Sequence, residues 1–122
     1  MSLSKSEEQL MNYLWKLKSA FMKDLLSEFP DPKPATTTVA TLLKRMQDKG
    51  FVDYKLYGNS REYFPLVKKK DYFSTHLKGL IKDFFDNSST QFASFFTSET
   101  DLSTEQLEAL KKIIDEQIKK QQ

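Results

Sequence analysis

Cysteine is absent from this chain of 122 residues, which excludes disulfide scaffolds, thiolate zinc sites and cysteine nucleophiles. The single histidine, His76, argues against a histidine metal site or a catalytic triad. Only three glycines and four prolines occur, which argues against a loop-rich sandwich or a disordered chain and favours helices. No apolar run approaches the roughly 18 residues of a membrane span, and no signal peptide opens the chain. These absences predict a cytoplasmic protein without metal or cofactor.

Charge is unevenly distributed along the chain. Residues 1–70 carry 13 Lys and Arg against 8 Asp and Glu, a net charge of +5. Residues 71–122 carry 6 against 9, a net charge of −3. Such an imbalance is common on solvated surfaces, but it also indicates that the front half faces a polyanion.

Three helices are predicted in the front half. Ser4 and Glu7 form a capping-box pattern at the start of the first helix. A second, shorter helix covers residues 21–29 and ends in a proline-rich connection. The third should cover residues 35–49, with Gly50 as its C-terminal stop. Its apolar stripe, at helical spacing, consists of Val39, Leu42, Leu43 and Met46.

A change of period then predicts a β-hairpin. Residues 51–57 alternate and are rich in β-formers, residues 58–60 read as a turn, and residues 61–67 read as a return strand. Pro65 suits the end of a strand or the edge of a sheet. Three helices followed by a hairpin is the order of a winged helix-turn-helix. The predicted fold class is therefore mostly α with a small β-hairpin wing.

The composition shifts at Lys68–Lys70, where we expect residues 1–68 to end as a DNA-binding domain and residues 69–122 to begin as a helical dimerisation region. Three further helices are predicted there, and Ser103 with Gln106 is a second capping box. Six Phe lie in this short segment, more than so small a unit can bury alone. Such a surface indicates an interface, although the helices could instead fold back on the front half. The residues expected in the dimer interface are Phe73, Leu77, Leu80, Ile81, Phe84, Phe85, Phe92, Phe95, Phe96, Leu107, Leu110, Ile113 and Ile114.

A candidate DNA-binding surface combines the polar face of the third helix with the tip of the hairpin. Threonine offers a hydroxyl to bases or phosphates and a methyl group to the thymine methyl, and Lys or Arg binds phosphate. One threonine at the helix start is expected to act only as an N-cap. The candidates are Thr36, Thr37, Thr38, Thr41, Lys44, Arg45, Lys55, Tyr57, Asn59, Ser60 and Arg61.

Several segments resemble the BlaI/MecI penicillinase-repressor family of bacterial transcription regulators. They are LSKSEEQLMNYLW from Leu3, TTTVATLLKRMQDK from Thr36, YKLYGNSREYF from Tyr54 and DLSTEQLEALKKIID from Asp101. The resemblance implies a winged helix-turn-helix followed by a three-helix dimerisation region. It also implies recognition-helix positions at Thr37, Thr38, Thr41 and Arg45, a wing at residues 57–61, and half-sites similar to TACA and TGTA.

Two positions depart from the family pattern. Ala40 stands where the best-known members have a recognition-helix Arg, so the operator is expected to differ in detail. The family also implies a membrane sensor protease system as a partner, which triggers a cut between an Asn and a Phe. The corresponding pair here is Phe95-Phe96, which lacks the Asn.

The function predicted from these observations is a dimeric transcriptional repressor that competes with polymerase for a palindromic operator on double-stranded DNA. Two alternatives remain at this point: a winged-helix module that binds another protein, and a ligand-sensing regulator with an aromatic cavity in its back half. An enzyme is not expected, because no nucleophile–base pair and no glycine-rich phosphate loop is visible.

Overall fold

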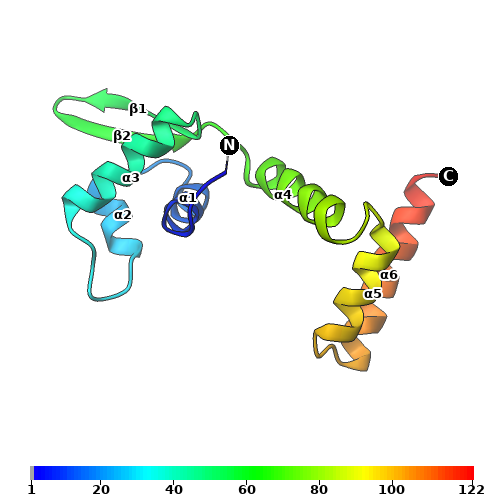
Figure 1. Cartoon of the computed structure of the whole chain (residues 1–122). Helices are drawn as coiled ribbons and strands as arrows, with labels where there is room; N and C mark the ends of the chain where they lie inside the picture. Colours follow the sequence, from blue (N-terminus) through cyan, green and yellow to red (C-terminus); the bar gives the residue numbers. More distant parts are fainter. Residues whose placement is uncertain (1) are drawn as a thin grey trace. The chain divides into compact units, whose positions relative to one another are not determined.

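The structure is a computed structural model that describes residues 2–122 (Figure 1). It divides into two compact units, one ending at residue 74 and one covering residues 75–122. The predicted fold class is confirmed, since the described chain contains mostly helix and one antiparallel hairpin. In chain order the elements are α1 (Lys5–Leu17), α2 (Met22–Glu28), α3 (Thr36–Asp48), β1 (Val52–Tyr57), β2 (Ser60–Pro65), α4 (Lys69–Phe84), α5 (Ser89–Glu99) and α6 (Thr104–Lys120).

Both predicted capping boxes are present. The Glu7 amide donates to Ser4 Oγ at 3.2 Å, and the Ser4 amide donates to Glu7 Oε1 at 2.7 Å. At α6 the Gln106 amide donates to Ser103 Oγ at 3.1 Å, and the Ser103 amide donates to Gln106 Oε1 at 2.8 Å. These reciprocal bonds satisfy backbone donors that a helix start leaves open, which is why each helix begins where the sequence predicts.

The start of α3 differs from the prediction that a threonine caps it. Ala35 occupies the N-cap position and provides no side-chain hydrogen bond. An N-cap residue has an extended backbone and stands directly before the first helical residue. The helix begins at Thr36, so this position belongs to Ala35, which precedes the threonines. The hydroxyls of the threonine run are therefore not used as the cap of this helix.

The hairpin forms in the predicted place with a shorter turn. Tyr57 pairs with Ser60, so Ser60 belongs to β2 rather than to the turn, and β2 ends at Pro65. Gly58 has φ +61, a conformation that glycine adopts without steric cost at the first position of a two-residue turn. Ala20 extends the sheet, since its amide donates to the Tyr63 carbonyl at 2.9 Å and its carbonyl accepts from the Tyr63 amide at 2.8 Å.

The core of the first unit lies where α1, α2, α3 and the base of the hairpin meet. The α3 stripe points into it as predicted, because Val39, Leu43 and Met46 are buried while Leu42 is half-buried. Full burial of side chains of this size contributes about 1.5–3 kcal/mol each. The other fully buried residues include Leu10, Met11, Leu14, Leu25 and Val52.

A partly buried ion pair joins the start of α1 to the end of α3, and the Lys49 side chain is 28% exposed. Glu7 keeps only 1% of its surface exposed, and Lys49 Nζ donates to Glu7 Oε1 at 2.7 Å. Burial raises the pKa of Glu7, but hydrogen bonds from Lys49 and Ser4 outweigh it and leave the pKa below its ordinary value. The carboxylate is therefore charged in the folded protein and depends on Lys49.

We expect Glu7→Gln to lower the free energy of unfolding by about 1.5–3 kcal/mol at pH 7, because a charged hydrogen bond is lost while the ammonium of Lys49 stays partly hydrated. The lowered pKa means that the stabilisation is present above the unfolded value of about 4.3 and is lost as the pH falls through the folded value. Urea unfolding between pH 7 and pH 3 should therefore show the two proteins converging. Glu28→Gln is the control, because it breaks the more exposed Lys16–Glu28 pair and should cost less than about 1 kcal/mol. Equal losses in both variants would contradict the assignment.

The first turns of α4 pack in the first unit. Tyr72 is buried, and its hydroxyl donates to Glu8 Oε2 at 2.7 Å. Burial, together with this hydrogen bond, raises the pKa of Tyr72 to about 12. Trp15 Nε1 donates to the Val67 carbonyl at 2.8 Å, and its ring lies 5.9 Å from that of Phe73. The division into a DNA-binding part and a dimerisation part at residues 68 and 69 stays a prediction.

The second unit contains the rest of α4 with α5 and α6, and none of its side chains is fully buried. The α4 helix ends at a left-handed pair, with φ +52 at Asp86 and φ +59 at Asn87. Asn87 is left-handed as predicted, but Asp86 is the first left-handed residue after the helix, and the Asn87 amide donates to the Ile81 carbonyl at 3.1 Å. The Phe85 ring then packs at 5.5 Å from Phe92 and 5.4 Å from Phe95. This aromatic cluster is the main packing within the unit.

Candidate nucleic-acid interface

The face of α3 opposite the core is fully accessible. Helical geometry turns successive residues by about 100°, so the positions between the buried stripe residues point outward. The predicted recognition positions on this helix are all exposed: Thr36, Thr37, Thr38, Thr41, Lys44 and Arg45. A helix with one buried stripe and one polar, cationic face can lie in a major groove without disturbing the core.

Two of these side chains already have partners within α3. Thr41 Oγ1 donates to the Thr37 carbonyl at 2.9 Å, which leaves the Thr41 hydroxyl free to accept. Lys44 Nζ lies 3.0 Å from Asp48 Oδ1, and both side chains are largely exposed. Such a surface pair contributes little stability, so Lys44 can exchange it for a phosphate at small cost.

The wing places its predicted residues on two faces of the hairpin. All five are exposed, namely Lys55, Tyr57, Asn59, Ser60 and Arg61. The register pairs Leu56 with Arg61 and Tyr57 with Ser60, so Arg61 and Tyr57 project from opposite faces. The Arg61 guanidinium lies 4.4 Å from the centroid of the Tyr54 ring, whereas Lys55 Nζ lies 5.9 Å from that of Phe64.

Arg61 is a permanent positive charge on this surface. A hydrogen bond with Tyr63, and secondarily the phenolic groups of Tyr54 and Tyr63, raise the pKa of Arg61 above its ordinary value. An arginine is already protonated at neutral pH, so the shift only reinforces its charge. No carboxylate within residues 2–122 forms an ion pair with it. The guanidinium is available to an external anion.

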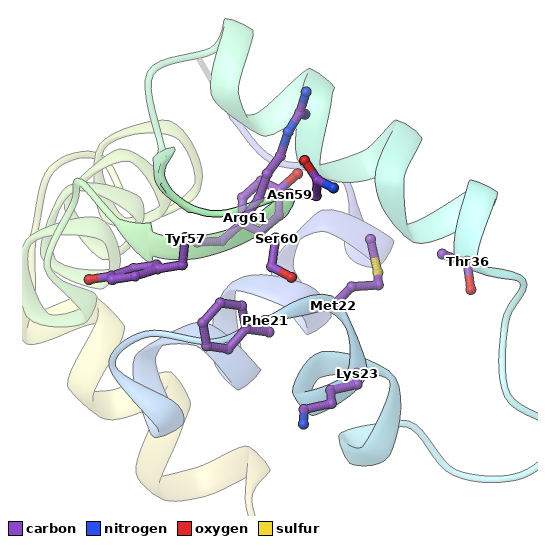
Figure 2. A pocket seen from close by; sticks show the side chains of 9 residues that line it. Phe21, Met22, Lys23, Thr36, Tyr57, Asn59, Ser60 and Arg61 are labelled. Atoms are coloured by element: carbon purple, nitrogen blue, oxygen red, sulfur yellow. The ribbon is translucent and has the colours of Figure 1, made fainter.

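An open groove of about 670 Å³ lies between α2, the start of α3 and the wing (Figure 2). It brings together five of the predicted residues, and the close-up shows Arg61 and Asn59 on the wing side with Thr36 on α3. None of its lining residues is acidic. The full lining consists of Phe21, Met22, Lys23, Thr36, Tyr57, Asn59, Ser60, Arg61 and Tyr63. The remaining predicted recognition residues, Thr37, Thr38, Thr41, Lys44, Arg45 and Lys55, lie outside the groove.

Sequence reasoning missed the contribution of α2 to this groove. Lys23 is exposed in the first turn of α2 and lines the groove together with Arg61. The Phe21 ring lies 6.0 Å from that of Tyr57 and joins α2 to the wing. The only available signal was the position of Lys23 at the start of the first helix of a helix-turn-helix, which crosses the DNA backbone in that motif. Two cations and no carboxylate make the groove suited to a polyanion.

A second candidate surface is the apolar face of residues 75–122. Large apolar side chains remain exposed on α4, α5 and α6, and Phe84 is the most exposed of them. Among the predicted interface residues, Leu77, Leu80, Phe84, Phe95, Phe96, Leu107, Ile113 and Ile114 are exposed, as is Phe73, whereas Ile81, Phe85, Phe92 and Leu110 are half-buried. Ile118, which the interface prediction omitted, is also exposed. Phe95 and Phe96 lie within α5.

Residues 2–122 contain neither a membrane-spanning helix nor a candidate metal site. No helix there is long and apolar enough to cross a membrane. No cluster of His, Asp and Glu in the same residues could hold a metal ion.

Comparison with known proteins gives consistent matches over both compact units. A family model described as "Penicillinase repressor" matches residues 3–116. The methicillin resistance regulatory protein MecI of Staphylococcus aureus is 27% identical over 114 residues, covering 93% of each chain. The protein of the same name from Mammaliicoccus sciuri is 26% identical over 114 residues. The penicillinase repressor of Bacillus licheniformis is 23% identical over 115 residues, covering 93% of this chain and 90% of its own.

Proposed function

This chain belongs to the penicillinase repressor family, and we propose that it is a homodimeric transcriptional repressor that binds an inverted-repeat operator in double-stranded DNA. The observation that carries the proposal is the continuity of the exposed face of α3 with the cationic groove beside it. Thr36 begins α3 and also lines the groove with Lys23 and Arg61. In a DNA duplex the base edges of the major groove are likewise flanked by the phosphates of the backbone. The exposed face of α3 therefore matches the base edges, and the cationic groove matches the flanking phosphates.

In the proposed complex α3 lies in the major groove. Arg45 and the threonine hydroxyls contact base edges, because arginine pairs with guanine and hydroxyls pair with several bases. Lys23, Arg61 and the polar groups of the wing tip contact phosphates of the bordering backbone. These contacts position the helix, and the α3 side chains supply the sequence preference.

The exposed apolar face of residues 75–122 is the proposed dimer interface. This many exposed large apolar side chains on so small a unit are rare on a protein that acts as a monomer. Two copies related by a two-fold axis would bury the same face on each chain and present two α3 helices to the DNA. A dimer bound over a promoter excludes polymerase without any covalent chemistry. We propose that a membrane sensor protease system, which the family resemblance implies, releases the repressor from its operator.

Arg45→Ala and Arg61→Ala should both weaken operator binding while leaving the fold intact, because both side chains are exposed. A base contact by Arg45 predicts a loss of about 1–3 kcal/mol and relaxed preference at one base position. A phosphate contact by Arg61 predicts similar weakening for every duplex and a shallower salt dependence of affinity. Titrations on the native promoter and on a scrambled duplex, at several salt concentrations, measure both effects.

Lys16→Ala is the matched control, since Lys16 is an exposed cation that pairs with Glu28 outside the proposed interface. It should bind DNA as the wild type does. Unchanged affinity in both arginine variants would contradict the proposed interface. Failure of the wild type to bind any duplex at low salt would favour a protein-binding winged helix instead.

A further inference from the structure

We infer that Tyr54 is a positioning residue that holds the Arg61 guanidinium ready for a DNA phosphate. This inference rests on the proposed function, because it assigns Tyr54 a role that acts only through the DNA contact of Arg61. Neither the polar pattern of the wing nor the threonine-rich helix draws attention to Tyr54, which is half-buried.

The hairpin register brings the two side chains to the same face. Tyr54 pairs with Tyr63, and Arg61 lies two positions before Tyr63 on β2. Residues in this diagonal relation project from one side of a sheet and are within reach of long or aromatic side chains. The guanidinium carbon of Arg61 accordingly lies 4.4 Å from the Tyr54 ring centroid, well inside the range of a cation–π interaction.

The Tyr54 ring packs against the ring of its cross-strand neighbour. It lies 5.5 Å from the Tyr63 ring, and Tyr63 is buried. Two backbone hydrogen bonds tie Tyr63 to Ala20, at 2.9 and 2.8 Å. Arg61 lies near the hairpin tip, but the Tyr54 ring that it contacts packs against Tyr63, which is part of the core of the first unit.

A cation–π contact orients a guanidinium without using its donors, and the hydrogen bond of Arg61 with Tyr63 leaves its other N–H groups available. The guanidinium carbon lies 4.4 Å from the ring centroid, and the N–H groups of a guanidinium project in its own plane, where they can bind two oxygens of a phosphate. Arg61 also lines the groove together with Lys23, and no carboxylate is among the residues that line this groove. Restricting the side chain before binding lowers the ordering cost of the complex.

The other face of the same hairpin provides an internal comparison. Lys55 Nζ lies 5.9 Å from the Phe64 ring, close to the limit of the interaction. An ammonium is a compact charge and has no plane that a ring could align. Phe64→Leu is therefore the matched control, since it removes an aromatic ring from the wing without touching the Arg61 face.

The test is a double-mutant cycle on duplex affinity with the full chain and its native promoter. We expect Tyr54→Leu to weaken binding by about 3- to 10-fold, the combined effect of the lost stack and the lost ordering. In an Arg61→Ala background the same change should alter affinity by less than about 1.5-fold, because nothing remains to be positioned. Tyr54→Phe retains the ring and should restore binding. Phe64→Leu should show no coupling to Arg61.

A nuclear magnetic resonance measurement tests the stack without DNA. A guanidinium held over a ring shifts the Arg61 side-chain protons upfield, and this shift should persist in Tyr54→Phe and Phe64→Leu but vanish in Tyr54→Leu. Thermal unfolding of each variant checks that the fold remains. An equal loss of affinity with and without Arg61 would mean that Tyr54 supports only the fold and would overturn the inference. If the wild type binds no duplex, both this inference and the proposed function fail, whereas binding without coupling overturns this inference alone.

Discussion

Phe84→Asp should convert the proposed dimer into a folded monomer and reduce operator affinity by about 100-fold or more. Phe84 is 79% exposed on a single chain. An aspartate at such a position costs a monomer little beyond helix propensity, on the order of 0.5 kcal/mol. In a dimer the same carboxylate would be buried without a partner, which costs several kcal/mol. The substitution therefore separates association from folding.

Sedimentation at micromolar concentration measures the change, and circular dichroism checks that the helices persist. Ile114→Asp provides a second variant, since Ile114 is 59% exposed on α6. Lys112→Asp is the control, because at about 100° per residue Lys112 falls on the polar face of the same helix. It changes the net charge more than the test variants do and should still leave the dimer intact. A wild-type protein that sediments as a monomer would contradict the proposed interface directly.

Insertion of 5 base pairs between the two half-sites should abolish most specific binding. A symmetric dimer presents two α3 helices on one side of the DNA, with half-site centres about 10 base pairs apart, or one helical turn. Half a turn of added DNA rotates one half-site to the opposite side of the duplex. A rigid dimer then binds one half-site only and loses about 100-fold or more in affinity.

Footprinting and titration on the native promoter measure the effect, with a 10-base-pair insertion as the control. The 10-base-pair insertion returns both half-sites to the same side of the duplex but places them farther apart. It therefore distinguishes the effect of rotation between the half-sites from the effect of their separation. Protection of a single asymmetric site, or equal binding after the 5-base-pair insertion, would show that the symmetric arrangement is wrong even if the protein binds DNA.

Features that depend on neighbouring residues could be predicted. The capping boxes at Ser4 and Ser103 formed as expected because each bond joins residues three positions apart. Gly58 and Asn87 adopt positive φ because few other residue types tolerate that backbone. The order of helices and hairpin followed from the change in apolar period, and it was sufficient to identify the winged helix.

Other features depend on partners far away in the chain and were not predicted. Lys49 pairs with Glu7 across 42 positions, and Trp15 bonds the Val67 carbonyl across 52. Lys23 lies near Arg61 only because the start of α2 packs beside the wing and lines the same groove. The N-cap of α3 is Ala35 and not one of the threonines, because Ala35 is the last residue with an extended backbone before the helix begins.

Apolar spacing and capping residues were therefore enough to decide the helices, the wing, the exposed face of α3 and the excess of aromatic residues in the second unit. Packing decided which cations lie together, which carboxylate is buried and which ring supports Arg61. The reason is physical: hydrogen bonds within a turn or a helix start involve neighbours, whereas the surroundings of a side chain depend on all the elements that pack against it.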